Sequence, residues 1–216
     1  MSQELVEYSF QESNQRTIVM VPGYTGGLEV SAIQEIVKHL VSCGNINVFG
    51  VPMSYAKDNL DVFDASQRRL VSCLSQIVSK VSGTDIVLVA KSLGGSLSLF
   101  NHLSLRISRM ILLGCPVILG WPQRISLLKV DNPVIPDYKK EWNDALLTLS
   151  VPTLILSGEL DNLTDNQFLT KVTKLNKNIQ LTIVENANHS LEDMTTNRQR
   201  VTDYMALIKE FSGLPT

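Results

Sequence analysis

Ser92 lies in a sequence pattern that could expose a nucleophilic hydroxyl group. It stands in the run AKSLG, after an apolar segment and before one of helical character, with the small residues Ala90 and Gly94 two positions to either side. A serine at a sharp turn from a strand into a helix has a strained backbone, and its neighbours must be small to avoid collision. The pattern therefore predicts an exposed hydroxyl, with the first helical amides, including that of Leu93, directed at the group that the serine attacks.

A serine near neutral pH needs a base within hydrogen-bond reach, and histidine is the usual one. The sequence has three histidines. His39 and His102 lie in, or near the end of, segments of helical character, where we expect them on helix surfaces. His189 lies in the polar loop ENANHS directly after an apolar run. Loops at the carboxyl ends of parallel strands gather at one edge of a sheet, where Ser92 also emerges, so elimination and position favour His189 as the base.

The imidazole in turn needs a carboxylate to fix its tautomer and to stabilise the imidazolium ion. The apolar run 153–156 is followed by the loop SGELDN, in which Gly158 permits a turn back toward the sheet edge. Asp161 is the first candidate for this acid, and Glu159 and Asp165 are the alternatives.

A glycine-rich loop, PGYTGG, follows the apolar run 17–21. A phosphate-binding loop would need a lysine and then a serine or threonine after its last glycine, but Leu28 and Glu29 stand there, and a carboxylate would repel phosphate. An oxyanion hole requires only a free backbone amide directed at the nucleophile. We therefore expect the amides of Tyr24 and Leu93 to form an oxyanion hole.

The elements that must position these residues are short apolar runs alternating with longer segments of helical periodicity. This alternation is typical of an α/β fold with a mostly parallel sheet of about six or seven strands covered by helices on both faces. The first run alternates in polarity and could form an edge strand, whereas the later ones are expected to be buried. The expected strands are 5–10, 17–21, 47–51, 86–90, 110–113, 153–156 and 180–184, and the clearest helices are 30–41, 60–81 and 196–211.

The length of 216 residues suits a single domain spanning residues 1–216. Four prolines and two tryptophans interrupt the rhythm of the segment 116–150. We expect this segment to form a short cap-like excursion, which either packs over the site or holds a small cluster of its own at the surface.

Composition excludes several classes of function. With 19 Lys and Arg against 21 Asp and Glu and no run of like charges, no basic face for nucleic acid is expected. The acidic N-terminus and the lack of an apolar stretch near the ~20 residues of a membrane span favour a cytoplasmic protein without integral membrane association. Cys43, Cys73 and Cys115 stand far apart in apolar surroundings, which favours reduced core cysteines over a metal or redox site.

The chain order Ser92, Asp161, His189, each after an expected strand, resembles the α/β-hydrolase superfamily along nearly the whole chain. The short length and the sequence NHSL at 188–191 resemble its small, nearly lidless branch, which includes the dienelactone-hydrolase-like and the testis-expressed/chromatin-complex-associated hydrolase-like proteins. That branch often has His-Gly in place of Pro22-Gly23 and Gly in place of Ala90. Dienelactone hydrolases proper use a cysteine nucleophile, so the serine argues against that activity.

The resemblance implies hydrolysis of a carboxylic ester, thioester or related acyl bond of a small molecule, through an acyl-enzyme and without a metal or organic cofactor. Two alternatives stay open: an inactive scaffold or binding protein, and an acyltransferase with the same triad. Lys91, next to the serine, is expected either to be solvated or to favour anionic substrates. The oligomeric state is left open.

Overall fold

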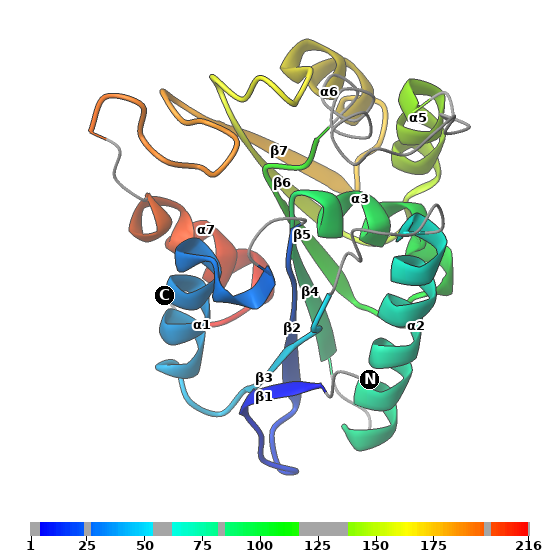
Figure 1. Cartoon of the computed structure of the whole chain (residues 1–216), viewed down its shortest axis with the longest axis vertical. Helices are drawn as coiled ribbons and strands as arrows, with labels where there is room; N and C mark the ends of the chain where they lie inside the picture. Colours follow the sequence, from blue (N-terminus) through cyan, green and yellow to red (C-terminus); the bar gives the residue numbers. More distant parts are fainter. Residues whose placement is uncertain are drawn as a thin grey trace.

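The computed structural model describes residues 5–23, 27–53, 62–81, 85–116, 138–196 and 200–215. These residues form one seven-stranded sheet, in which the first strand is antiparallel to its neighbour and every other neighbouring pair is parallel. The strands are β1 (Val6–Ser9), β2 (Arg16–Val21), β3 (Asn47–Gly50), β4 (Asp85–Lys91), β5 (Arg109–Leu113), β6 (Thr153–Gly158) and β7 (Ile179–Val184). Their order across the sheet is β1-β3-β2-β4-β5-β6-β7 (Figure 1).

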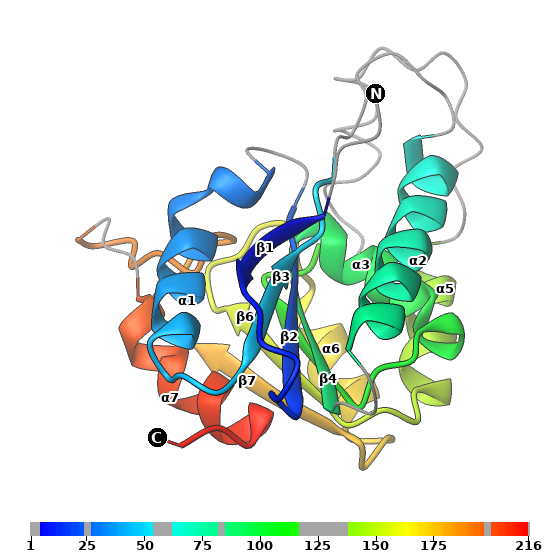
Figure 2. The ribbon, with the colours of Figure 1, turned by 90° about the horizontal axis from the view of Figure 1, so that it is seen from below.

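Helices cover both faces of the sheet. The α-helices are α1 (Ser31–Val41), α2 (Val62–Lys80), α3 (Leu93–Phe100), α5 (Tyr138–Thr148), α6 (Asn166–Thr173) and α7 (Val201–Ser212), and the 3-10 helices are η1 (Gly27–Glu29) and η2 (His102–Ser104). One face packs against α1 and α7, and the other against α2, α3, α5 and α6, as Figures 1 and 2 show. The α/β fold predicted from the sequence, with a mostly parallel sheet between two helical layers, is confirmed.

The central strands owe their apolar runs to this double cover. Along β4, Val87 and Val89 lie in the core under α1 and α7, whereas Leu88 and Ala90 lie in the core on the opposite face. All four side chains are 0% exposed. A strand that faces water on one side would alternate apolar and polar residues, so a continuous apolar run is the pattern expected of strands buried on both faces.

The later part of the segment 116–150 belongs to the core rather than to a cap. Its residues 138–148 form α5, and Trp142 of this helix is fully buried. The Trp142 ring packs edge-on against Phe100 of α3, with 5.9 Å between the ring centroids. Residues 117–137, including Trp121, lie outside the described residues.

The C-terminal elements differ from the sequence expectation in two details. Helix α7 begins at Val201 rather than near residue 196, because Asp193 Oδ1 accepts the amide protons of Thr195 and Thr196 at 2.9 Å in a turn of its own. Strand β7 was expected to be a buried parallel strand, but among the described strands it lies at the edge of the sheet, next to β6. Most of its side chains are accordingly only partly covered: Ile183 is 37% exposed, whereas Val184 is buried.

Cys43, Cys73 and Cys115 are free thiols, and the last two are buried. Among the helices described, none has the length and apolar character to cross a bilayer. Within the same residues, no group of three or more His, Cys, Asp or Glu side chains is arranged to hold a metal ion.

Candidate active site

Ser92 stands at the sharp turn between β4 and α3. Its backbone has φ 53° and ψ −124°, a conformation that costs a non-glycine residue about 1–3 kcal/mol. The turn is held on both sides, because the Ser92 amide donates to the carbonyl of Leu113 on β5 at 2.9 Å and the Ser92 carbonyl accepts from the amide of Gly95 at 2.9 Å. At Gly94, a β-carbon would collide with the carbonyl of Pro22, which explains the need for a small residue there.

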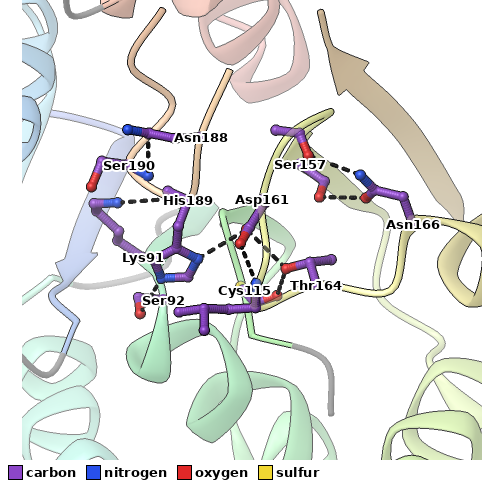
Figure 3. A network of polar contacts seen from close by, with 12 residues as sticks. Lys91, Ser92, Cys115, Ser157, Asp161, Thr164, Asn166, Asn188, His189 and Ser190 are labelled. Carbon is purple, nitrogen blue, oxygen red and sulfur yellow. Dashed lines mark hydrogen bonds and ion pairs between the residues drawn. The ribbon is translucent and has the colours of Figure 1, made fainter. Parts of the chain in front are cut away.

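The structure brings together the serine, histidine and aspartate that the sequence singled out. Ser92 Oγ lies 2.8 Å from His189 Nε2, and His189 Nδ1 lies 2.9 Å from Asp161 Oδ2. Figure 3 shows the three side chains in one row, with the imidazole in the middle. With the Nδ1 proton directed at the carboxylate, Nε2 is left to accept the proton of the serine.

Asp161 is held as a buried carboxylate. Its side chain is 0% exposed, the Leu163 amide donates to its Oδ1 at 2.8 Å, and Thr164 Oγ1 lies 2.9 Å from its Oδ2. Burial alone would raise the pKa of Asp161. The hydrogen bond and charge of His189, with the bonds from Leu163 and Thr164, outweigh burial and lower the pKa below its usual value. The group is therefore ionised at neutral pH.

The two alternative acids have other partners. Glu159 Oε2 accepts the amide proton of Asn186 at 2.8 Å, which ties the loop after β6 to the loop after β7. Asp165 precedes α6, and its Oδ1 accepts the Phe168 amide proton at 2.9 Å as a helix cap. Of the three candidates, Asp161 is the one that bonds to His189.

His189 is carried by residues 185–192, which we call the histidine loop. Asn188 organises it: its Oδ1 accepts the amide protons of Ser190 at 2.8 Å and of Glu192 at 3.0 Å, while its Nδ2 donates to Glu192 Oε2 at 3.0 Å. Leu191 takes a positive φ of 59° within this loop and is nevertheless buried. Such over-determined bonding holds the imidazole in one place.

Two further residues at the site, Gly114 and Thr164, were not predicted from the sequence. Gly114 directly follows β5, has φ 50°, and lies so close to the His189 carbonyl that a β-carbon would collide with it. Thr164 Oγ1 lies 2.8 Å from the carbonyl oxygen of Cys115 as well as 2.9 Å from Asp161 Oδ2. The signal that could have found Gly114 is its position, since a glycine directly after a buried strand stands at the same sheet edge as Ser92.

Of the two expected oxyanion donors, the Leu93 amide lies within the described residues. Leu93 is the first residue of α3, so its amide has no acceptor within the helix and is available to a ligand. Tyr24 lies outside the described residues. The adjacent Gly23 is described, and a β-carbon there would lie 2.8 Å from Ser92 Cβ. The backbone of the loop after β2 therefore lies against the nucleophile.

Lys91 and His102 differ from the expectations. Lys91 was expected to be solvated or to face substrate, but it is only 7% exposed, and its Nζ donates to the His189 carbonyl at 3.5 Å. Burial lowers the pKa of Lys91, against the favourable charges of nearby groups. His102 was expected on a helix surface, but it is 5% exposed on η2, with Nδ1 2.7 Å from the Leu99 carbonyl. His39 lies on α1 and is partly exposed.

Solved structures with the same fold include several hydrolases. Est1E from Butyrivibrio proteoclasticus superimposes with a TM-score of 0.69 at 19% identity, over 96% of this chain and 90% of that one. XC6422 from Xanthomonas campestris, described as a serine hydrolase without a lid, superimposes with a TM-score of 0.66 at 15% identity, over 98% of this chain and 88% of that one. A lipase-esterase related protein from Clostridium acetobutylicum superimposes with a TM-score of 0.69 at 16% identity, over 96% of this chain and 98% of that one. At these identities the likeness concerns the fold alone.

No curated protein matches this sequence significantly. Residues 26–212, by contrast, match the family described as an alpha/beta hydrolase domain. The match extends from residue 26, just before η1, to the last residue of α7, and so includes all the strands from β3 onward. The chain therefore belongs to the α/β-hydrolase family.

Proposed function

We propose that this protein is a serine hydrolase that cleaves an ester, thioester or related acyl bond of a small molecule through an acyl-enzyme at Ser92. The observation that supports this most is the unbroken row of hydrogen bonds from Ser92 Oγ through His189 to Asp161, at 2.8 and 2.9 Å. These distances are in the range that proton transfer between a nucleophile and its base requires.

In the first step, Ser92 Oγ attacks the acyl carbonyl carbon while His189 Nε2 takes its proton. The imidazole then carries a positive charge, which the buried carboxylate of Asp161 stabilises through Nδ1. His189 next gives the proton to the departing alcohol or thiol. The acyl group is left on Ser92, and water repeats the sequence to release the acid and restore the serine.

The negative charge that develops on the substrate oxygen needs donors that are already in place. The Leu93 amide at the start of α3 is one, and it also carries part of the positive end of the helix dipole. The contact of Gly23 with Ser92 favours a second donor from the same loop, and we assign that role to the Tyr24 amide.

A fluorophosphonate probe tests this proposal without knowledge of the natural substrate, because it reacts with an activated serine. We expect the wild type to be labelled, peptide mass spectrometry to locate the label on Ser92, and Ser92→Ala to stay unlabelled. His189→Gln should be labelled slower by several orders of magnitude. A well-folded wild type that takes no label would overturn the proposal and favour a binding role for the fold.

The bond type is a separate question. p-Nitrophenyl esters of graded chain length, assayed beside acyl-CoA thioesters, compare ester with thioester cleavage. An added alcohol or amine acceptor that collects the acyl group instead of water would identify a transferase.

A further inference from the structure

Lys91 places an amino group beneath the histidine loop. It is the last residue of β4, and the alternation of side chains along the strand puts it on the same face as Val87 and Val89, the face covered by α1 and α7. Its Nζ donates to the His189 main-chain carbonyl at 3.5 Å (Figure 3). The residue is 7% exposed, so its amino group is largely desolvated.

The groups that act electrostatically on Lys91 come from the loops after three other strands. Asp161 follows β6, while Glu192 and His189 belong to the histidine loop after β7. Cys115 follows β5, and burial raises the pKa of its thiol, which keeps it neutral. The carboxylates of Asp161 and Glu192 therefore favour the ammonium form of Lys91 and oppose the effect of burial.

Lys91 is the basic side chain that meets the buried triad, where Asp161 and Glu192 both bring negative charge. Asp161 is an ionised carboxylate with a 0% exposed side chain, and an imidazole that accepts the serine proton has to be in its neutral form. Asp161 and His189 alone would thus carry one uncompensated negative charge in a buried place, which is costly. Among the described side chains that hydrogen-bond to the triad residues, Lys91 is the one with a basic amino group, whose protonated form supplies a positive charge.

The negative charge of an uncompensated Asp161 would also favour protonation of the neighbouring imidazole. A protonated imidazole cannot accept the proton of Ser92. A positive charge close to the ring works against this, because like charges in a site of low dielectric repel.

We propose that Lys91 is a positioning residue whose ammonium group anchors the main chain at His189 and balances the charge of Asp161, so that the imidazole stays neutral and ready to act as a base. This inference rests on the proposed hydrolase function, and it gives Lys91 a role behind the site rather than at the substrate. Lys91 does not touch the reacting atoms.

The test is the pH dependence of fluorophosphonate labelling at Ser92, from about pH 5 to 9, where histidine bases titrate. Lys91→Met removes both the charge and the donor, Lys91→Gln removes only the charge, and Lys91→Arg keeps both. Lys38→Met is the matched control, since it removes one charge from an exposed position on α1. Thermal melting of each variant identifies those that fold, and a misfolded Lys91→Met leaves Lys91→Gln as the neutral variant.

We expect the pH of half-maximal labelling to rise by about one unit in the neutral variants, which corresponds to a tenfold lower labelling rate on the acid side of the profile. In Lys91→Arg and Lys38→Met this pH should stay unchanged. Lys91→Gln should regain more of the maximal rate than Lys91→Met, because its amide can still donate to the His189 carbonyl. A folded neutral variant with an unmoved profile, whatever its maximal rate, overturns the inference and leaves Lys91 with a packing role. An unlabelled wild type would instead count against the hydrolase proposal.

Discussion

The main-chain carbonyl of His189 lies against Gly114, in a space that has room for a hydrogen atom but not for a β-carbon. The two residues belong to loops that follow β7 and β5, and β6 separates these strands in the sheet. The histidine loop must therefore fold back across the end of β6 before its imidazole can reach Ser92 on the turn after β4. Gly114 and Gly158, the last residue of β6, are the two glycines that this path approaches too closely for a β-carbon.

Gly114→Ala should displace the histidine and destabilise the fold. We expect labelling of Ser92 to fall by on the order of 10²-fold, because misplacement by about an ångström is enough for such a loss. Gly44→Ala is the control: Gly44 has φ 63°, but nothing lies within 4 Å of its β-carbon position. It should lose about 1 kcal/mol in urea unfolding and keep its labelling rate. Equal labelling by the two variants would show that the contact with His189 carries no functional weight.

A comparison of Asp161→Asn with Glu159→Gln should show which of the two acids supports His189. The amide cannot hold the imidazole in the tautomer that accepts the serine proton, so we expect labelling to slow by on the order of 10⁴-fold while the chain stays folded. Glu159→Gln should stay within about threefold of the wild type, since Glu159 bonds to the Asn186 amide and glutamine can still accept that proton. A larger loss in Glu159→Gln than in Asp161→Asn would exchange the roles of the two acids.

The backbone of Ser92 predicts an unusual order of stability. At φ 53°, glycine is relaxed and alanine is strained, so Ser92→Gly should unfold at higher urea concentration than Ser92→Ala, by about 1 kcal/mol. At Ser75, an exposed position within α2, the order should reverse by a similar ~1 kcal/mol, because glycine is the poorer helix residue. If alanine is the more stable substitution at both positions, the turn is not strained in solution.

Acid should remove the contribution of Asp161 to stability. Its pKa is lowered in the folded state, so the stabilisation is present above the unfolded value of about 3.9 and is lost as the pH falls through the folded value. The free energy of unfolding should therefore fall less steeply below about pH 4 in Asp161→Asn than in the wild type. The measurement is urea unfolding of both proteins at several acid pH values. If the free energy of unfolding falls equally steeply with pH in both, the hydrogen bonds and charges around the Asp161 carboxylate do not stabilise the fold.

Most of the fold could be predicted because a doubly covered sheet requires continuous apolar runs. Strands β2, β4 and β5 follow that rule, and each lies within one residue or so of its expected bounds. Helix α5 escaped prediction because its buried side chains, such as Trp142, follow a stretch interrupted by prolines. The partial exposure of β7 could not be foreseen either, since strand order decides which strand is last in the sheet.

For the site, the sequence indicates which loops meet but not which way their side chains turn. Glu159 and Asp161 are two residues apart in one loop, and only coordinates show that the first bonds to Asn186 and the second to His189. Lys91 illustrates the same limit. A lysine beside the nucleophile suggests a solvated or substrate-facing charge, and its burial under the histidine loop depends on loops that are about 100 residues further along the chain.

The position of β7 at the edge of the sheet has a consequence for how activity and fold are coupled. An edge strand has one neighbour to hold it, and such segments open in local fluctuations that cost less than global unfolding. Detachment of β7 would carry His189 away while the turn at Ser92, between strands in the centre of the sheet, keeps its shape. The nucleophile thus stands after a central strand and the base after an edge strand. We therefore expect mild warming to lower the labelling of Ser92 before it unfolds the protein.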